Sequence, residues 1–184
     1  MRTLNMVEKA RAFAALAHKC QMYGDRPYLY HLDHVAQVAE RFGHGEWPLV
    51  MVCCYLHDVI EDTDVTKEEL ADHFGHTIAD VVSFVSDVDG KDKEFLFKNY
   101  TGKDRVATLV KYCDRVANVE ACLAENKTEI LKKYISEQPL FEKYLTNDGF
   151  DREIQQYLKE LIRVAKVYTG DLLRVTKMHG DDSR

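Results

Sequence analysis

A buried apolar run that ends in four ionisable residues is the feature that most constrains this chain. The run Val50–Leu56 is followed directly by His57 and Asp58, and then by Glu61 and Asp62. An unbroken apolar run of this kind is typical of an element buried on all sides, and we expect a buried helix. Charged groups buried beside it need a cation or a hydrogen-bond network to offset their lost hydration. The sequence therefore predicts a lined cavity, most economically a metal site, at the end of this helix.

Helical spacing favours a functional role for these four residues. His57 and Glu61 are four positions apart, as are Asp58 and Asp62, so each pair can line the same side of a site. The alternative interpretation of a His-Asp pair at a helix end is a surface pair or a cap. The repeated acids and the buried run before them favour metal-dependent hydrolysis over that interpretation.

Apolar residues recur at helical intervals along most of the chain, which predicts the fold class all-α, a compact orthogonal helical bundle. Three prolines and nine glycines are few, and no hairpin or internal repeat is convincing. Thr66-x-x-Glu69 is a capping-box signature for a helix that ends near Phe74-Gly75. We expect helices at about 6–17, 31–42, 47–58, 66–74, 78–85, 105–125, 129–145 and 151–168, a turn at 147–149 and a frayed tail at 180–184.

Length and composition predict one cytoplasmic domain. A chain of 184 residues can bury roughly two-thirds of its unfolded surface, and we expect a single domain over 1–184. The formal charge of -6 argues against broad nucleic-acid binding. No apolar stretch approaches the roughly 20 residues that span a bilayer, and no signal peptide precedes Met6. Three of the five cysteines lie in apolar stretches and none forms a C-x-x-C motif, which favours packed free thiols.

A metal shell needs donors from other helices, and His31 and Asp114 are the best candidates. His31 lies at the start of the second predicted helix, and Asp114 lies inside the apolar segment 109–118. Together with His57 and Asp58 they offer two nitrogens and two carboxylates. This set suits Mn²⁺, with Fe²⁺ as the alternative, and leaves positions open for water and substrate, whereas structural zinc sites prefer thiolates.

The residues alone leave several assignments open. His34 is a rival ligand, His31 could be an ordinary interfacial histidine, and Asp114 could be a structural acid paired with Arg115 or Lys111. We interpret the remaining histidines as structural or solvent-facing: His18, His44, His73, His76 and His179.

Three blocks, in this order along the chain, resemble the HD-domain metal-dependent phosphohydrolases, and within them the hydrolase domain of the RelA/SpoT family. The resemblance covers roughly residues 7 to 125. An HD pair alone is weak evidence, but HDxxEDT between two further blocks is specific. The blocks are Ala14-x-x-Ala17-His18-x-x-Gln21 with Gly24-x-x-Pro27-Tyr28-x-x-His31, then Leu56-His57-Asp58-Val59-Ile60-Glu61-Asp62-Thr63, and then Lys111-x-x-Asp114-Arg115-x-x-Asn118.

The resemblance implies a fold of the HD-domain type and a role for each site residue, while helical periodicity predicts the further helices at about 129–170. Glu61 and Asp62 would orient or deprotonate the attacking water. The reaction implied is removal of the 3′-pyrophosphate from guanosine tetra- or pentaphosphate by a stand-alone small alarmone hydrolase. One Mn²⁺ would be held by His31, His57, Asp58 and Asp114, and Lys111 and Asn118 would lie near the nucleotide and its phosphates. We also select Arg26 and Tyr28 of the first block as substrate contacts, although Tyr28 could belong to the core instead of stacking on a base.

The chain departs from the family pattern where a nucleotide would be recognised. The first loop, Gln21–Arg26, has one basic residue in place of the usual Arg-Lys pair, and Leu32 replaces a typical proline. The segment Val116–Ala121 lacks the usual arginine and threonine. A second hypothesis therefore keeps the metal site with another nucleotide, such as an adenine alarmone, NADPH or a dNTP. A third is a non-catalytic nucleotide-binding or antitoxin-like protein, and a homo-oligomer stays open.

The polar segment 87–101 and the residues after it carry basic side chains ahead of the long helix. A polyphosphate-facing loop and a solvated charged loop are both compatible with them, because acidic residues are interleaved. The basic residues are Lys91, Lys93, Lys98, Lys103 and Arg105.

Overall fold

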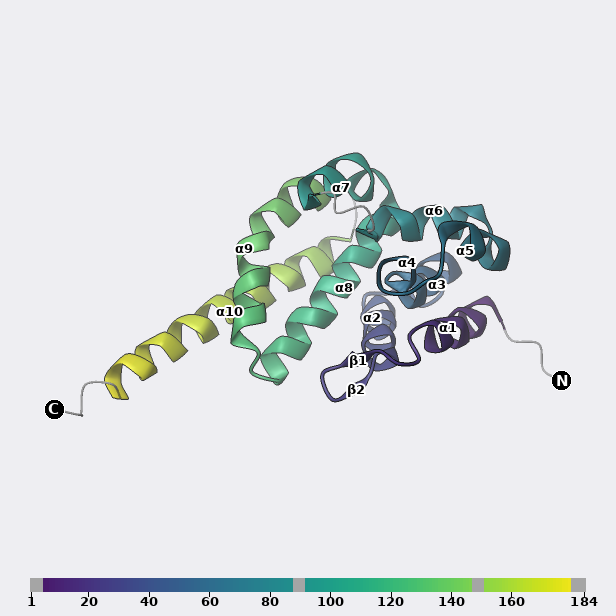
Figure 1. The fold of residues 1–184 in the computed structure, drawn as a ribbon. Helices are drawn as coiled ribbons and strands as arrows, with labels where there is room; N and C mark the ends of the chain where they lie inside the picture. Colours follow the sequence, from purple (N-terminus) through teal and green to yellow (C-terminus); the bar gives the residue numbers. More distant parts are fainter. Residues whose placement is uncertain (1–4, 88–91, 147–150, 180–184) are drawn as a thin grey trace. The chain divides into compact units, whose positions relative to one another are not determined.

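Helices make up most of the computed structural model, which describes residues 5–87, 92–146 and 151–179 (Figure 1). The all-α prediction is confirmed. The expected turn at 147–149, the tail at 180–184 and Lys91 lie outside the described residues. The chain forms two units, residues 1–117 and 118–184, whose boundary falls inside helix α8 (Arg105–Ala124). The single domain stays a prediction.

Helix α3 (Pro48–Leu56) is the buried helix that the apolar run predicts. It contacts α1 (Met6–Ala17), α2 (Leu29–Arg41) and α6 (His76–Val85). Pro48 occupies its first turn, where a missing N–H costs no hydrogen bond. The helix stops at Leu56, and the His-Asp pair forms a turn before the four-residue helix α4 (Val59–Asp62). The buried helix α3 is therefore followed directly by His57 and Asp58, and it fixes where these two residues lie.

A short hairpin corrects the expectation that the chain contains none. Strands β1 (Met22–Tyr23) and β2 (Arg26–Pro27) pair antiparallel. Gly24 has a φ of +66°, which a residue without a Cβ adopts at little cost. The hairpin was missed because two-residue strands are too short to show an alternating pattern.

The capping signature at Thr66 marks the start of a helix, as expected. The Thr66 hydroxyl accepts a hydrogen bond from the N–H of Glu69 at 3.1 Å, at the start of α5 (Lys67–Phe74). Gly75 ends this helix with a φ of +89°. Thr66 thus satisfies one of the N–H groups that the first helical turn leaves without a partner.

The basic segment before α8 is partly helical, which corrects the expectation of a loop. Helix α7 (Lys93–Asn99) begins after Asp92, whose carboxylate accepts from the N–H of Phe95 at 3.0 Å. Leu96 and Phe97 are buried. Their burial stabilises the helix, and the surrounding charges obscured this short apolar signal. A 3₁₀ turn (Thr101–Lys103) follows.

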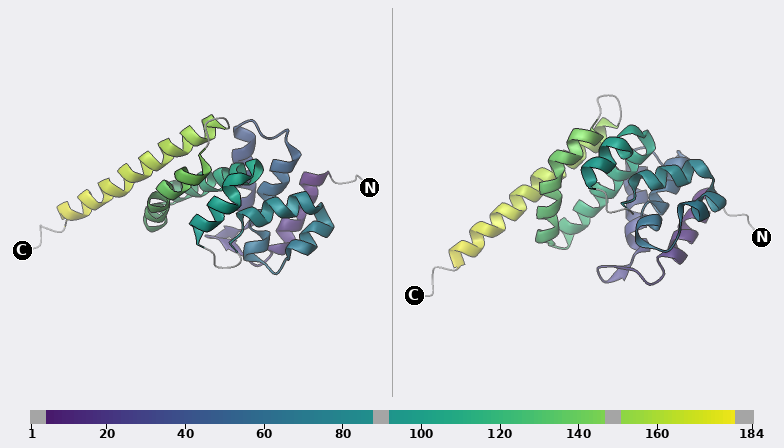
Figure 2. Two further views of the ribbon diagram at one scale, coloured as in Figure 1. Left: turned by 90° about the horizontal axis from the view of Figure 1, so that it is seen from above. Right: turned by 45° about the horizontal axis from the view of Figure 1, so that its top comes forward.

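The second unit contains α9 (Thr128–Leu145) and α10 (Arg152–His179), which contact each other and lie side by side in both views of Figure 2. Both helices were expected, and α10 continues beyond its predicted end at Tyr168. The buried residues of α10 between Ile154 and Thr169 recur at helical intervals, so this part of the helix buries one face.

Cysteine burial agrees with the sequence interpretation. The five cysteines form no disulfide, and all except Cys20 are buried. Over residues 5–87, 92–146 and 151–179, no helix is both long and apolar enough to cross a bilayer.

Replacement of the N-cap by Thr66→Ala should lower the free energy of unfolding by about 1 kcal/mol, because the Glu69 N–H loses its partner. Urea denaturation followed by circular dichroism measures this. Ser136→Ala, within α9 and exposed, is the matched control and should leave the unfolding free energy nearly unchanged. Equal effects of the two substitutions would contradict the capping role.

Candidate metal centre

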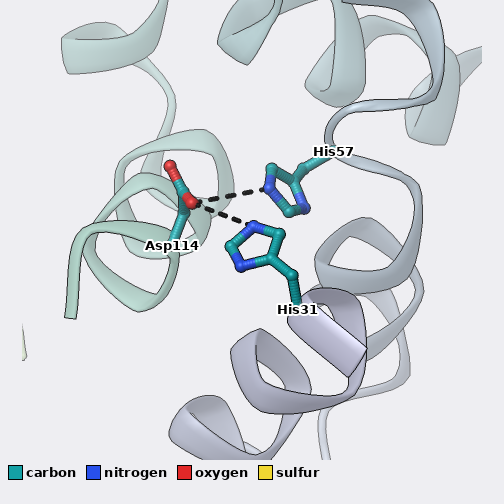
Figure 3. A group of neighbouring side chains, drawn as sticks. All are labelled: His31, His57 and Asp114. Atoms are coloured by element: carbon teal, nitrogen blue, oxygen red, sulfur yellow. Dashed lines mark ion pairs between the residues drawn. The ribbon is translucent and has the colours of Figure 1, made fainter. Parts of the chain in front are cut away.

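Two histidines and two aspartates from three parts of the first unit converge on one point. His31 comes from the first turns of α2, His57 and Asp58 from the turn after α3, and Asp114 from α8. Figure 3 shows His31 and His57 directed toward Asp114. The Oδ1 atom of Asp114 lies 3.4 Å from Nε2 of His31 and 3.6 Å from Nε2 of His57.

Asp58 completes this group from the side of the turn. Its Oδ2 atom lies 2.9 Å from Nε2 of His57 and 3.6 Å from Nε2 of His31. One ligand atom each from His31, His57 and Asp114 lies within 4.8 Å of the others, a spacing that can hold a metal ion. The structure therefore brings together all four residues that the sequence analysis selected as metal ligands. His34, the rival candidate, is not among the residues of this group.

Burial differs between the nitrogen and oxygen donors. The side chains of His31 and His57 are 2% and 0% exposed, whereas those of Asp58 and Asp114 are 14% and 16% exposed. The histidines are held within the protein interior, and the carboxylates lie nearer to solvent. A divalent cation bound to this set would keep access to water.

The orientation of His57 is fixed by the core helix before it. Its Nδ1 atom lies 2.9 Å from the carbonyl oxygen of Cys54, and a carbonyl can only accept, so Nδ1 carries a proton. Nε2 is therefore the nitrogen that can bind a metal. It is buried and makes no hydrogen bond among the described residues. In metal sites a ligating imidazole usually donates its other N–H to a carbonyl or carboxylate, as His57 does here.

Charge compensation shifts the pKa values of all four groups. Burial opposes the charged form of His57, but Asp58 and then Asp114 outweigh it and raise the pKa of His57 well above its ordinary value. The pKa of His31 is raised as well, because Asp114 and Asp58 outweigh its burial. In Asp58 and Asp114 burial favours the neutral acid, yet the two histidines hold the pKa of each carboxyl well below its usual range. The centre therefore retains two carboxylates that need positive charge nearby.

Lys111 and Tyr28 lie beside the two carboxylates. The Lys111 ammonium is 3.9 Å from Oδ2 of Asp114. The Tyr28 hydroxyl donates to Oδ2 of Asp58 at 2.5 Å. Burial, followed by the charge of Asp58, raises the pKa of Tyr28 far above its ordinary value, so the hydroxyl keeps its proton. Lys111 thus lies beside the centre, and its contact with a phosphate stays a prediction, while Tyr28 is hydrogen-bonded to a predicted ligand.

Glu61 and Asp62 are exposed at the end of α4. Oε2 of Glu61 accepts a hydrogen bond from the N–H of Asp87 at 2.9 Å. Oδ2 of Asp62 accepts one from Nε2 of Gln21 at 2.8 Å. Each acid is thus oriented by a different segment, and their role toward water stays a prediction.

The remaining two predicted substrate residues, Arg26 and Asn118, come from β2 and from α8. Arg26 is exposed in β2, and its guanidinium lies over the ring of Tyr30 at 4.2 Å from the centroid. Asn118 follows Asp114 by four residues in α8 and belongs to the second unit. The roles of both toward a nucleotide stay predictions.

The sequence analysis quotes His18 and Gln21 in the first motif block but assigns neither a role in the site. His18 is buried, which agrees with the structural one of the two interpretations, and its Nδ1 lies 2.7 Å from Oε1 of Gln21. The signal in the sequence was the spacing His18-x-x-Gln21 at the end of the first predicted helix. The further partners of this pair, Tyr28 for His18 and Asp62 for Gln21, lie next to it only in the folded protein.

Comparison with known proteins identifies the family. An HD domain family model matches residues 10–98. The chain is 30% identical over 134 residues to the guanosine-3′,5′-bis(diphosphate) 3′-pyrophosphohydrolase MESH1 of Xenopus tropicalis, covering 67% of this chain and 75% of that protein. It is 28% identical to human MESH1, covering 84% and 92%. The chain belongs to the HD domain family, in which it is related to the 3′-pyrophosphohydrolases of guanosine-3′,5′-bis(diphosphate).

A solved structure and a bacterial protein are also similar to this chain. A solved structure described as a metazoan ortholog of SpoT that hydrolyses ppGpp matches with a TM-score of 0.73 and 21% identity, covering 89% of this chain and 97% of that one. At this identity the match supports the fold alone. The guanosine-3′,5′-bis(diphosphate) 3′-pyrophosphohydrolase of Aquifex aeolicus is 31% identical over 122 residues, which is only 17% of its length.

Metal affinity should increase as the pH is raised from about 6 to about 8, because a metal and a proton compete for Nε2 of His31 and of His57. Since the pKa of each histidine is raised, competition persists above the pH at which an ordinary histidine is neutral. Isothermal titration calorimetry with Mn²⁺ in buffers of different ionisation enthalpy counts the protons released. A pH-independent affinity without proton release would contradict this site.

Proposed function

We propose that this protein is a Mn²⁺-dependent phosphohydrolase that removes the 3′-pyrophosphate of guanosine tetra- or pentaphosphate. The observation that carries the proposal is the convergence of His31, His57, Asp58 and Asp114 at the end of the buried helix. Two imidazoles and two carboxylates suit a divalent ion of the Mn²⁺ or Fe²⁺ type. The raised histidine pKa values and lowered aspartate pKa values indicate a site that favours positive charge at its centre.

Each group in this site has a distinct task in the proposed reaction. A bound Mn²⁺ would lower the pKa of a coordinated water and offset phosphate charge. His31, His57, Asp58 and Asp114 would hold the ion, and Glu61 and Asp62 would orient the water and take its proton. Lys111, beside Asp114, would contact a phosphate oxygen. These contributions are required because the attacked phosphate already carries negative charge.

The guanosine alarmone is proposed from the relatives. The MESH1 proteins of frog and human are named for this substrate, and the human one aligns with 84% of this chain. The buried thiols in a chain without a disulfide are compatible with a reducing cytoplasm.

One observation favours a second candidate, an HD phosphohydrolase for a different nucleotide. The hairpin carries Arg26 as its only basic residue, with a carboxylate oxygen of Asp25 3.8 Å away. The acid reduces the positive potential that this loop offers to a polyphosphate. An adenine alarmone, NADPH and a dNTP are therefore the alternative substrates.

The deciding experiment is product analysis by anion-exchange chromatography. Purified protein with Mn²⁺ should convert guanosine 3′,5′-bis(diphosphate) to GDP and pyrophosphate, and chelation of the metal should stop the reaction. An inert guanosine alarmone would overturn the substrate assignment. The same protein would then be tested with the adenine alarmone, NADPH and dNTPs, and inactivity with all of them would favour a binding protein.

Two matched substitution pairs test the proposed roles. Asp58→Asn and Glu61→Gln should each lower kcat by at least about a hundredfold, because one removes a ligand charge and the other a proton acceptor. Asp64→Asn and Glu68→Gln are the same changes at exposed neighbouring positions and should leave kcat within about twofold of the unsubstituted protein. Undiminished turnover by the Asp58 variant would contradict the assignment of Asp58 to the metal site.

A further inference from the structure

Three side chains link the metal ligand Asp58 to Asp62 without being ligands themselves. The Tyr28 hydroxyl donates to Asp58, and the Tyr28 ring stacks on His18 with centroids 4.6 Å apart and planes 26° apart. Nδ1 of His18 contacts Gln21 at 2.7 Å, and Gln21 donates to Asp62 at 2.8 Å. We call His18, Gln21 and Tyr28 the bridging triad.

Backbone hydrogen bonds around the hairpin hold the triad together. The N–H of Gln21 donates to the carbonyl of His18 at 2.9 Å, where α1 ends. The N–H of Tyr28 donates to the carbonyl of Gln21 at 3.1 Å, on the far side of the hairpin. The hairpin thus returns the chain so that residues ten positions apart in sequence, His18 and Tyr28, lie in contact.

The two hydrogen bonds that lead from His18 through Gln21 to Asp62 run in one direction. A carboxylate only accepts, so Nε2 of Gln21 donates to Asp62 and Oε1 of Gln21 faces His18. Nδ1 of His18 must then be the protonated nitrogen that donates to Oε1. Donor and acceptor are thus defined at both contacts of the Gln21 amide, which favours this orientation of the amide over the flipped one.

The Tyr28 hydroxyl donates to the oxygen of Asp58 that faces the metal-binding nitrogen of His57. Oδ2 of Asp58 accepts from Tyr28 and is also the oxygen 2.9 Å from Nε2 of His57. The hydroxyl therefore fixes the rotation of this carboxylate. A ligand that is already held in place loses less side-chain freedom when it binds an ion.

We propose that the bridging triad positions both halves of the site, with Tyr28 holding the ligand Asp58 and with His18 and Gln21 holding Asp62. The first half requires only the metal centre, whereas the second rests on the proposed function, in which Asp62 acts on water. Tyr28 is thereby assigned to the metal ligand and not to the nucleotide.

The Tyr28 half is tested with the hydroxyl removed and the ring retained. Tyr28→Phe should raise the Kd for Mn²⁺ about tenfold in isothermal titration calorimetry, the size of effect typical of a group that hydrogen-bonds a metal ligand. The matched control is Tyr157→Phe, which loses a hydrogen bond of the same kind, 2.6 Å to Oε1 of Glu120, in the second unit. The control should bind Mn²⁺ as the unsubstituted protein does. An unchanged Kd in Tyr28→Phe would overturn the proposal, as would an equal loss in the control.

The Asp62 half is tested by breaking the link at its polar atoms. Gln21→Met keeps the length of the side chain but removes its amide, and His18→Phe keeps a ring against Tyr28 but removes Nδ1. Both should lower kcat about tenfold, with KM and the Kd for Mn²⁺ unchanged, because Asp62 loses its orientation and the ligands do not. A rise in KM alone would show contact with substrate and overturn the positioning role.

The two halves fail in distinguishable ways. Mn²⁺ binding is measured without any nucleotide, so an inert guanosine alarmone would count against the proposed function and leave the Tyr28 result standing. Thermal unfolding of every variant, followed by circular dichroism, establishes that the compared proteins are folded.

Discussion

Two carboxylates and two imidazoles withdrawn from water must balance one another's charge, and the site of the first unit is arranged around this requirement. Asp58 and Asp114 lie within 3.6 Å of the histidines, which is why the histidine pKa values rise and those of the aspartates fall. Such a cluster is costly inside a protein unless a cation or protons neutralise it. The close approach of His31 and His57 to the two acids therefore requires positive charge between them, from a cation or from protons.

The surrounding structure restricts how these donors can move. The carbonyl of Cys54 orients His57 from the core side, and the hydroxyl of Tyr28 orients Asp58 from the hairpin side. Preorganised donors bind a cation with less loss of side-chain freedom. This connects packing to chemistry, because a shift of the buried helix or of the hairpin would displace a ligand. The hairpin is small, but it closes a path of contacts that runs from Asp58 to Asp62 through the bridging triad.

The sequence predicted the helices whose apolar spacing is long and regular, and it missed elements that are short. Helix α3 was expected nearly to its ends because it is an unbroken apolar run, and the long helix α8 because its apolar residues recur over several turns. The hairpin at Met22–Pro27 and helix α7 were not expected, since two strand residues or one buried Leu-Phe pair give too weak a periodic signal. The candidate ligands were found because residues with strong chemical preferences stood beside apolar runs.

The sequence by itself determined the family and the types of donor, because the order of the three motif blocks and the ionisable residues within them are properties of the chain. Only the tertiary structure decided that Tyr28 donates to Oδ2 of Asp58 and that His18 and Gln21 connect Tyr28 to Asp62. These contacts join residues up to 41 positions apart. Periodicity reports which face of its own helix a residue occupies, whereas contacts of this kind depend on how separate elements pack.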